Sequence, residues 1–414
     1  MSAATLAPTS TLIALPLACA RCGRKQDAAP VHICQDCLGP LEPVYDVERR
    51  LPTPEVIAAR PRSLWRYREW LPFTGEPVES TDTGWTPLID APALADRLGV
   101  ARCWIKNDAL SFPSLSFKDR VVSTALNAVR AFGLDVVGCA STGNLANAVA
   151  AHAARAGLPA WIFIPESLEQ AKILATAVFG AHLVRVRGTY DDVNRLCAQV
   201  ADRFGWGIVN VNLRAYYGEG SKTVAFEIAE QLGWRSPTAV VAPMAGGSLV
   251  TKVGKGFREF QRAGFLDSTP RIFGAQAEGC APIVRMIEHG TDTLVPERPH
   301  TIARSLAIGA PADGPAARHT ILESGGWARA VSDVALVAGI RLLAETTGIF
   351  AETAGGVTVA AAASLAASGH LSADDEVVLC ITGNGLKTTD AIESAIAPSP
   401  LIEPRLREVA ALVA

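Results

Sequence analysis

Two short strings in the sequence carry residue types that could do chemistry together. Ser-Phe-Lys-Asp-Arg at 116–120 presents a primary amine, Lys118, where a loop is expected to run into a helix. Ser-Thr-Gly-Asn at 141–144 forms a turn of small hydrogen-bonding residues between a hydrophobic strand and another helix. A primary amine that forms a Schiff base, near a turn rich in N–H donors, is what pyridoxal 5′-phosphate chemistry needs. Taken alone, Lys118 would be interpreted as a solvated lysine paired with Asp119.

Two later turns contain glycine and suit the same cofactor. One of them follows a predicted strand at 239–243, opens a helix, and consists of Ala245, Gly246, Gly247 and Ser248. Glycines at such a place let backbone amides approach a phosphate. The other is Thr-Gly-Asn-Gly at 382–385, where the hydroxyl of Thr382 can hydrogen-bond a pyridine nitrogen. Each turn alone is a weak signal, but the order and spacing of all four strings favour one site.

The turn at 141–144 has two compatible interpretations. Ser141, Thr142 and Gly143 precede a predicted helix, so their N–H groups point outward at the positive end of its dipole and can bind a carboxylate. Serine, threonine and asparagine also suit the N-cap of that helix. Asn144 can in addition donate a hydrogen bond to the phenolate oxygen of the cofactor.

Strands and helices alternate along the sequence from about residue 100. The predicted strands are 136–140, 161–164, 183–187, 207–211, 239–243, 272–276 and 377–381, and the predicted helices include 145–156, 167–179 and one running from the glycine turn through 260. This alternation indicates an α/β fold with parallel sheets covered by helices on both faces. Ligands of such sheets bind at the carboxyl ends of the strands, where the four strings fall. Residues 290–330 are less regular and are expected to cross the surface or the site.

Bulk composition restricts the class of protein. A chain of 414 residues with 49% apolar and 19% charged residues should hold two or three globular domains. The net charge of −3 argues against a nucleic-acid-binding surface. Residues 1–18 lack the basic start of a signal peptide, and no stretch is long and apolar enough for a membrane span. We therefore expect a cytoplasmic protein that binds neither nucleic acid nor membranes.

Four of the nine cysteines form two Cys-x-x-Cys pairs at the start of the chain. The ligand candidates are Cys19, Cys22, Cys34 and Cys37, with eleven residues between the pairs. Two such turns can close a tetrahedral zinc site that leaves no position for water, so the ion would be structural. The alternative is four free thiols or a site that has lost its metal. The remaining cysteines are scattered in apolar segments, as in a reducing cytoplasm.

The lysine string, the two asparagine turns and the cysteine pairs together resemble threonine synthases. These enzymes belong to the pyridoxal-phosphate superfamily of tryptophan synthase β and cysteine synthase, of fold type II. Segments 301–309 and 350–358 are also similar to segments of threonine synthases. The similarity runs from Cys19 to about Leu386.

The resemblance implies two doubly wound α/β domains with the cofactor in the cleft between them, plus a small zinc ribbon. The expected boundaries are 1–45 for the ribbon, 46–120 with 215–414 for the larger cofactor-binding domain, and 121–214 for the smaller one. A homodimer is also implied.

The resemblance further implies roles for single residues. Lys118 would be the Schiff-base lysine and proton shuttle, Asn144 would contact the ring oxygen and Thr382 the ring nitrogen, while amides of 245–248 would hold the cofactor phosphate. The substrate would be O-phospho-L-homoserine, converted with water to L-threonine and phosphate.

A substrate phosphate needs its own donors, separate from those of the cofactor. Arg214 is the first candidate, because a guanidinium binds phosphate in a bidentate manner. Lys222, Ser116 and Asn212 are further candidates. An arginine in a loop and a lysine at a helix start are equally often just solvated.

Two strings depart from the threonine synthase pattern. Many relatives read Asn-Pro-Thr-Gly where this chain has Phe-Pro-Ser-Leu at 112–115, and the phosphate turn is Ala-Gly-Gly-Ser instead of Gly-Asn-Ala-Gly-Asn. The alternatives are therefore a threonine dehydratase, a cysteine or cysteate synthase, or an enzyme for a related phosphorylated or phosphonate amino acid. A zinc-ribbon interaction protein on an inactive scaffold is disfavoured by the intact Lys118, Asn144 and Thr382.

Overall fold

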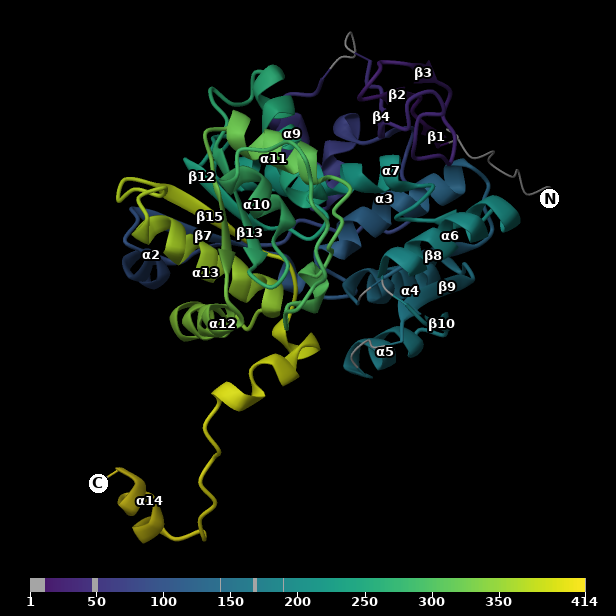
Figure 1. Ribbon diagram of the computed structural model, residues 1–414. Helices are drawn as coiled ribbons and strands as arrows, with labels where there is room; N and C mark the ends of the chain where they lie inside the picture. Colours follow the sequence, from purple (N-terminus) through teal and green to yellow (C-terminus); the bar gives the residue numbers. More distant parts are fainter. Residues whose placement is uncertain (1–11, 47–50, 142, 167–169, 189, 414) are drawn as a thin grey trace, which may run out of the picture.

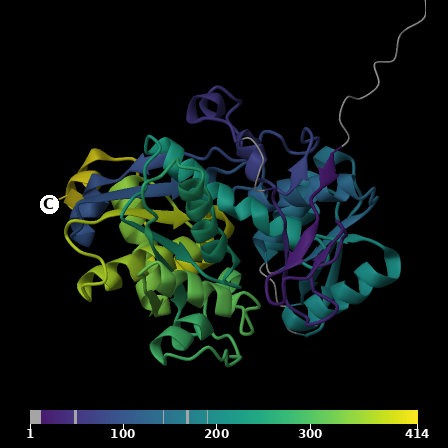
Figure 2. The ribbon, with the colours of Figure 1, turned by 90° about the horizontal axis from the view of Figure 1, so that it is seen from above.

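The computed structural model describes residues 12–46, 51–141, 143–166, 170–188 and 190–413. Two separate parallel sheets, each with helices on both faces, form the body, and a small three-stranded sheet lies against it (Figures 1 and 2). The predicted α/β class with mainly parallel sheets is therefore confirmed.

The larger sheet has six strands in the order β14-β13-β12-β15-β7-β6. Its strands are β6 (Leu88–Asp90), β7 (Arg102–Asn107), β12 (Ala239–Pro243), β13 (Arg271–Ala277), β14 (Ala328–Val331) and β15 (Glu376–Ile381). Only the edge strand β6 is antiparallel to its neighbour. The central strands read as continuous apolar runs, because both of their faces are covered.

Helices from opposite ends of the sequence cover the two faces of this sheet. One face carries α2 (Pro92–Leu98) and α13 (Thr353–Ala367), with α12 (Asp333–Thr347) packed outside α13 (Figure 1). The other face carries α9 (Ser248–Arg262) and α11 (Gly314–Glu323), with α8 (Thr223–Gln231) and α10 (Pro282–Glu288) beside them.

The smaller sheet has four parallel strands in the order β10-β9-β8-β11. They are β8 (Val137–Ala140), β9 (Ala160–Pro165), β10 (His182–Val186) and β11 (Gly207–Ile208). The associated helices are α3 (Lys118–Ala131), α4 (Asn144–Ala156), α5 (Gln170–Ala177) and α6 (Tyr190–Phe204). Helix α4 ends at Gly157, whose φ of 65° is the left-handed conformation that stops a helix. Residues 167–169 of the predicted helix 167–179 lie outside the described residues.

The predicted strand at 207–211 is wrong beyond Ile208. The amide of Asn212 folds the chain back on itself, because its Oδ1 accepts from the backbone N–H of Ile208 at 2.8 Å and its Nδ2 donates to the carbonyl of Trp206 at 3.0 Å. The strand therefore stops after two residues, and a turn leads into α7 (Arg214–Glu219).

The expectation for 290–330 is confirmed only in its first part. Residues 289–313 form a long loop with one short 3₁₀ turn, η4 (Arg304–Leu306). From Gly314 the chain is regular: Pro315 starts α11, Ala317 and Ile321 bury one face of it, and β14 then adds an edge strand to the larger sheet. The error arose because β14, Ala-Arg-Ala-Val, has only four residues and is interrupted by an arginine.

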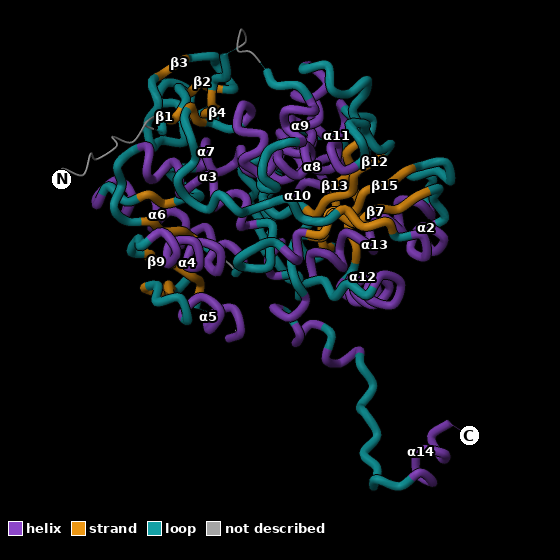
Figure 3. The backbone as a smooth tube through the Cα atoms, turned by 180° about the vertical axis from the view of Figure 1, so that it is seen from behind, coloured by secondary structure: helices purple, strands orange, loops and turns teal. Residues whose placement is uncertain are grey.

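The N-terminal module, residues 17–45, is an antiparallel sheet of β2 (Leu17–Cys19), β3 (Lys25–Gln26) and β4 (Leu41–Pro43). Just before it, β1 (Ile13–Ala14) pairs with β5 (Phe73–Thr74) of the body. The module lies beside α7 in views from opposite sides (Figures 1 and 3). Its Leu17 and Leu41 belong to the main buried cluster, so it is packed on the body.

Short helical segments complete the chain. Residues 51–74 contain α1 (Pro54–Ala58) and the 3₁₀ segment η1 (Leu64–Trp70), and the C-terminal α14 (Leu406–Val413) stands away from the body (Figure 1). Within the described ranges, every helix is too short or too polar to cross a membrane.

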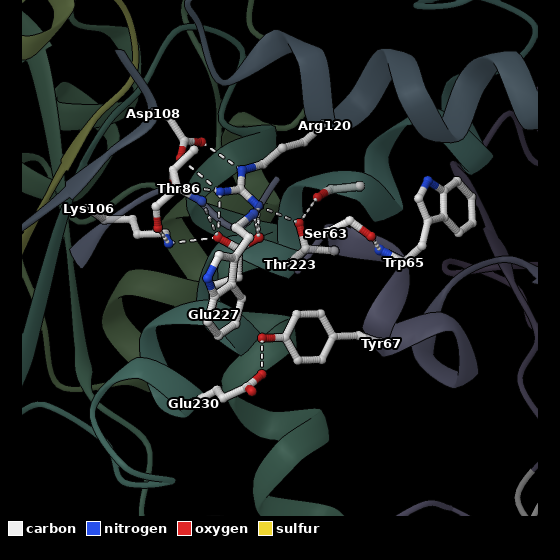
Figure 4. Close-up of polar contacts among 12 residues, drawn as sticks. Ser63, Trp65, Tyr67, Thr86, Lys106, Asp108, Arg120, Thr223, Glu227 and Glu230 are labelled. Atoms are coloured by element: carbon white, nitrogen blue, oxygen red, sulfur yellow. Dashed lines mark hydrogen bonds and ion pairs between the residues drawn. The ribbon is translucent and has the colours of Figure 1, made fainter. Parts of the chain in front are cut away.

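A buried ionic network lies directly behind the start of α3 (Figure 4). The guanidinium of Arg120 bonds to Asp108 at 2.7 Å and to Glu227, and Lys106 lies 2.7 Å from the same Glu227 carboxylate. Thr86 completes the set through its hydroxyl, which donates to Asp108. All four charged side chains are almost fully inaccessible, and the two cations balance the two anions. Arg120 and Lys106 lower the pKa of Glu227 to about 2, against the effect of its burial.

Replacing Glu227 with glutamine should destabilise the protein strongly. The change preserves shape but leaves Arg120 and Lys106 with one buried anion, and breaking such a set costs about 3–5 kcal/mol. Urea unfolding followed by tryptophan fluorescence measures the effect.

The matched control is Glu345→Gln, which removes an exposed partner of Arg341 and should change the free energy of unfolding by about 0.5 kcal/mol or less. Equal shifts in the two variants would show that the buried network does not stabilise the fold.

Candidate active site

A cavity of about 230 Å³ opens between the two sheets, at the carboxyl ends of their strands. Four predicted strings converge on it from distant parts of the chain. The predicted residues that line it are Lys118, Ser141, Gly143, Asn144, Arg214, Ala245, Gly246, Gly247, Ser248 and Thr382. The loop 305–313 forms another part of the wall.

Lys118 is the first residue of α3, and its amine reaches into the cavity. The loop before it is tied to the end of β15, because Phe117 donates its N–H to the carbonyl of Thr382 at 2.9 Å. Burial lowers the pKa of Lys118 to about 8, although the carboxylate of Glu352 opposes this shift. With a pKa near 8, roughly a tenth of this amine is neutral at pH 7. The Nζ atom donates a hydrogen bond to the hydroxyl of Tyr217 at 3.2 Å.

Asn144 starts α4 and is held between two groups of opposite charge. Its Nδ2 lies 2.9 and 2.8 Å from the two carboxylate oxygens of Glu352, and Lys387 donates to its Oδ1 at 3.3 Å. The carboxylate requires an N–H and the ammonium requires an oxygen, so the amide has one favoured orientation.

The turn at 245–248 leads directly into α9. Gly247 adopts a φ of 93° as the N-cap, where a side chain would meet the carbonyl of Asp313 at 2.9 Å. At Gly246 an added Cβ would find only Ile308, 4.0 Å away, so the space above the backbone is open to a ligand. The first N–H groups of a helix have no partner within it, and here they border a cavity large enough for an anion.

Helix α7 and the turn after it present one face to the cavity. Arg214, Tyr217 and Ser221 line the cavity and recur at a spacing of three and four residues. Arg214 forms an ion pair with Asp313 at 2.7 Å, and although burial opposes its charge, this carboxylate raises the pKa of Arg214. Burial also raises the pKa of Tyr217, so its phenol stays neutral and can both donate and accept.

The other predicted substrate residues lie in different places. Ser141 lines the cavity, but its Oγ accepts from the N–H groups of Gly143 and Ala146, as an N-cap does. Ser116 is fully buried beside the cavity and pairs through its backbone with Gly383. Thr142 lies outside the described residues.

Two of the predicted substrate residues point away from the cavity. Asn212 uses its side-chain amide to close the turn after β11. Lys222 is fully buried on the opposite side of α7, 2.5 Å from Glu219 and 2.9 Å from Glu259. As placed, neither can contact a ligand, because each side chain is already held by the protein.

Comparison with known proteins identifies the family of this chain. A family model described as "Pyridoxal-phosphate dependent enzyme" matches residues 79–383. The threonine synthase of Methanocaldococcus jannaschii is 35% identical over 90% of this chain and 93% of that protein. This chain belongs to the threonine synthase family of pyridoxal-phosphate-dependent enzymes. The threonine synthase of Synechocystis is 36% identical over 81% of the chain and 86% of its own length.

Solved structures of the superfamily share the fold. Maize serine racemase superposes with a TM-score of 0.64 at 21% identity, over 76% of this chain and 92% of that one. Threonine deaminase isoform 2 from Solanum lycopersicum gives a TM-score of 0.62 at 24% identity, over 76% and 89% of the two chains. The chain is thus a fold type II member, as the sequence predicted.

The cavity suits the cofactor that gives the family its name. Lys118 offers a partly neutral amine, α9 offers unpaired N–H groups beside an open glycine, and Thr382 and Asn144 offer uncharged hydrogen-bonding groups. These groups match an aldehyde, a phosphate and a pyridine ring with a phenolic oxygen.

The four N-terminal cysteines form a separate candidate metal site. Their sulfur atoms all lie within 4.8 Å of one another, with Cys19 and Cys37 at 3.4 Å and Cys22 and Cys34 at 3.8 Å. A tetrahedral zinc with sulfur ligands at about 2.3 Å would keep the sulfurs about 3.8 Å apart. The arrangement therefore fits a structural Zn²⁺.

Among the residues that sequence reasoning missed, Tyr217 and Glu352 line the cavity, and Lys387 contacts Asn144 beside it. Glu352 falls inside the segment 350–358 already noted as similar to threonine synthases, but no spacing links Glu352 or Lys387 to Asn144. Tyr217 could have been found from the spacing of Arg214, Tyr217 and Ser221, which places them on one face of a helix.

The lowered pKa of Lys118 predicts how the apoprotein takes up pyridoxal phosphate. The neutral amine is the nucleophile, so the rate of covalent uptake should rise with pH and level off above about 8. At pH 7 a pKa near 8 instead of 10.5 makes the neutral fraction roughly 300-fold larger. Stopped-flow absorbance measures the rate.

The control is Nα-acetyl-lysine, whose rate should still be rising at pH 10. An apoprotein rate that also rises through pH 10 would show an ordinary, solvated amine at Lys118.

Proposed function

We propose that this protein is a threonine synthase that converts O-phospho-L-homoserine and water to L-threonine and phosphate. The observation that carries the proposal is that one cavity joins two separate anion-binding groups to a reactive amine. The start of α9 suits the cofactor phosphate, Arg214 suits a second phosphate, and Lys118 is the amine. Threonine synthases at 33–36% identity over most of the chain support the same reaction.

When bound, pyridoxal phosphate supplies an electron-withdrawing ring joined to the amino group of the substrate. Lys118 is proposed to take the proton from Cα in its neutral form and, after releasing that proton, to remove one from Cβ. Phosphate leaves from Cγ, and Cγ then takes up a proton to become the methyl group. Water adds its hydroxyl at Cβ, and a proton returns to Cα to complete threonine. Burial lowers the pKa of Lys118 to about 8, so the neutral amine that this role requires is far more populated at neutral pH than in an exposed lysine.

Tyr217 is proposed to orient the amine between these proton transfers. Its hydroxyl contacts Nζ of Lys118 at 3.2 Å, so it can accept from the ammonium and donate to the neutral amine. Its raised pKa keeps it from taking the proton itself. Ser141, Gly143 and the first turn of α4 are proposed to hold the substrate carboxylate.

Three coarser expectations belong to the same proposal. The cysteine site of the N-terminal module holds a structural Zn²⁺, supported by the spacing of its sulfur atoms. We also propose that the protein works in the cytoplasm as a homodimer. The proposed domain boundaries stay 1–45, 46–120 with 215–414, and 121–214, and the division of the strands between the two sheets supports them.

Phosphate release tests the reaction directly. Purified protein loaded with pyridoxal phosphate should release phosphate from O-phospho-L-homoserine and produce threonine in equal amount. Lys118→Ala should lose at least about 1,000-fold in rate, because the base that moves both protons is absent. A phosphate assay with chromatographic identification of threonine provides the measurement.

A protein that binds pyridoxal phosphate but leaves this substrate unchanged would refute the proposed reaction. It would favour an enzyme for a related amino acid, with its specificity altered near the departing string at 112–115.

Arg214→Ala should weaken binding of the substrate and leave binding of the cofactor unchanged. Loss of one charged, bidentate hydrogen-bonding group costs about 1.5–3 kcal/mol, which corresponds to a roughly 10- to 150-fold rise in KM. Affinity for pyridoxal phosphate, measured by fluorescence titration, should stay within about twofold, because α9 holds that phosphate.

Arg341→Ala, which removes an exposed arginine of α12, is the matched control and should behave as wild type. An unchanged KM in Arg214→Ala would remove Arg214 from the substrate site.

A further inference from the structure

Helix α7 lies between the cavity and the N-terminal module. One face of α7 and of the 3₁₀ turn after it, η3 (Gly220–Lys222), carries Arg214, Tyr217 and Ser221 and borders the cavity. The opposite face carries Tyr216, Glu219 and Lys222, which contact the module and its neighbours. A helix of six residues has little stability of its own, so its position is fixed by packing against α3 and by these outer contacts.

The contacts on the outer face centre on the buried carboxylate of Glu219. Tyr45 of the module donates its hydroxyl to Glu219 at 2.6 Å. Lys222, Lys252 and Lys255 lie 2.5, 2.7 and 3.0 Å from the same carboxylate. Glu42, on strand β4 of the module, in turn binds Lys252 at 3.0 Å and Lys255 at 2.9 Å. We call this group of side chains the Glu219 cluster. Its members are Glu42, Tyr45, Glu219, Lys222, Lys252, Lys255 and Glu259.

The charges of the Glu219 cluster balance at three carboxylates and three ammonium groups. Glu219 and Lys222 have no measurable solvent exposure, so these charges are stable only with all of their partners present. Two of the partners, Glu42 and Tyr45, come from the module. Attraction to Lys252 is the main reason that the pKa of Glu42 is lowered to about 2, so this partner is ionised at neutral pH.

The metal-binding half of the module is directly joined to these partners. Strand β4 pairs with β2 so that Leu41 lies opposite Cys19, and Glu42 is the next residue along β4. Three-stranded sheets this small need an outside source of stability, which four cysteines with a metal can supply. The four-cysteine set therefore holds the strand that presents Glu42 to α9 and leads to Tyr45, which contacts α7.

We propose that the N-terminal module is a positioning device for the active site: through the Glu219 cluster it holds α7 so that Arg214 and Tyr217 face the cavity. The module touches no reacting atom and needs no open metal position. Its effect on substrate binding rests on the function proposed above, whereas its effect on α7 does not.

Hydrogen–deuterium exchange of residues 214–222 tests the proposal without any substrate. The variants are Tyr45→Phe, which removes one hydroxyl, Glu42→Gln, which removes one charge, and their combination. Each is made in the full-length protein with zinc content measured. We expect about tenfold faster exchange of 214–222 in the double variant, and no change in α13, which lies beyond the larger sheet.

Zinc removal from the wild-type protein with a chelator should speed exchange in the same residues of α7. Glu345→Gln, an exposed carboxylate far from the module, is the matched control and should leave α7 unchanged. Unchanged exchange of 214–222, either in the double variant or in the zinc-free protein, overturns the proposal.

Steady-state kinetics test whether the module affects substrate binding. In the double variant, KM for O-phospho-L-homoserine should rise about tenfold while affinity for pyridoxal phosphate stays within twofold. In an Arg214→Ala background, the same double variant should add little, because the two changes act through one contact. If the effects of the double variant and of Arg214→Ala on KM multiply fully, the role of Arg214 in the proposal is overturned. Absence of turnover in the wild-type protein would refute only the proposed reaction.

Discussion

The structure depends on the need to neutralise the buried Arg120. A guanidinium cannot be deprotonated, so its burial requires anions on fixed elements around it. Asp108 follows β7, Glu227 lies on α8, and Thr86 precedes β6, so one side chain joins two strands of the larger sheet and a helix beside it to α3. Lys118 stands two residues before Arg120, in the same helical turn. The position of the reactive amine is therefore a consequence of ion pairing behind it.

The same principle recurs at two other walls of the cavity. Asn144 faces the cavity from α4 and is oriented by Glu352 on one side and Lys387 on the other. Arg214 and Tyr217 face it from α7, whose far side is held by the Glu219 cluster. In each case the residue that meets the ligand is uncharged or singly charged, and a charge-balanced set lies behind it. Precision at the site thus comes from groups that never touch the ligand.

Much of this arrangement could be predicted from the sequence, because buried parallel strands are continuous apolar runs and the functional turns follow them. The remaining residues could not be predicted for one physical reason. The sequence does not fix the rotation of a short helix or turn about its own axis, so it does not say which side chains face the cavity. The sequence ranks Arg214 before Lys222 only by the chemistry of its guanidinium. In the structure Arg214 on α7 lines the cavity, whereas Lys222 in the turn after α7 points to Glu219. Asn212 resembled a ligand-binding amide, but its side chain closes the turn that ends β11 at Ile208. Glu352 is linked to Asn144 only by the meeting of two distant segments.

The order of strands in the larger sheet has a consequence for synthesis of the protein. Strand β15 (Glu376–Ile381), the last in the sequence, lies at the centre between β12 and β7. That sheet cannot close until nearly the whole chain has left the ribosome, whereas strands β8 to β11 are contiguous in sequence and can pair during translation. The first half of the large sheet must therefore wait, with apolar strand edges uncovered, for its central strand. Any need for chaperones should fall in that interval, and truncation before residue 376 should leave an aggregating product.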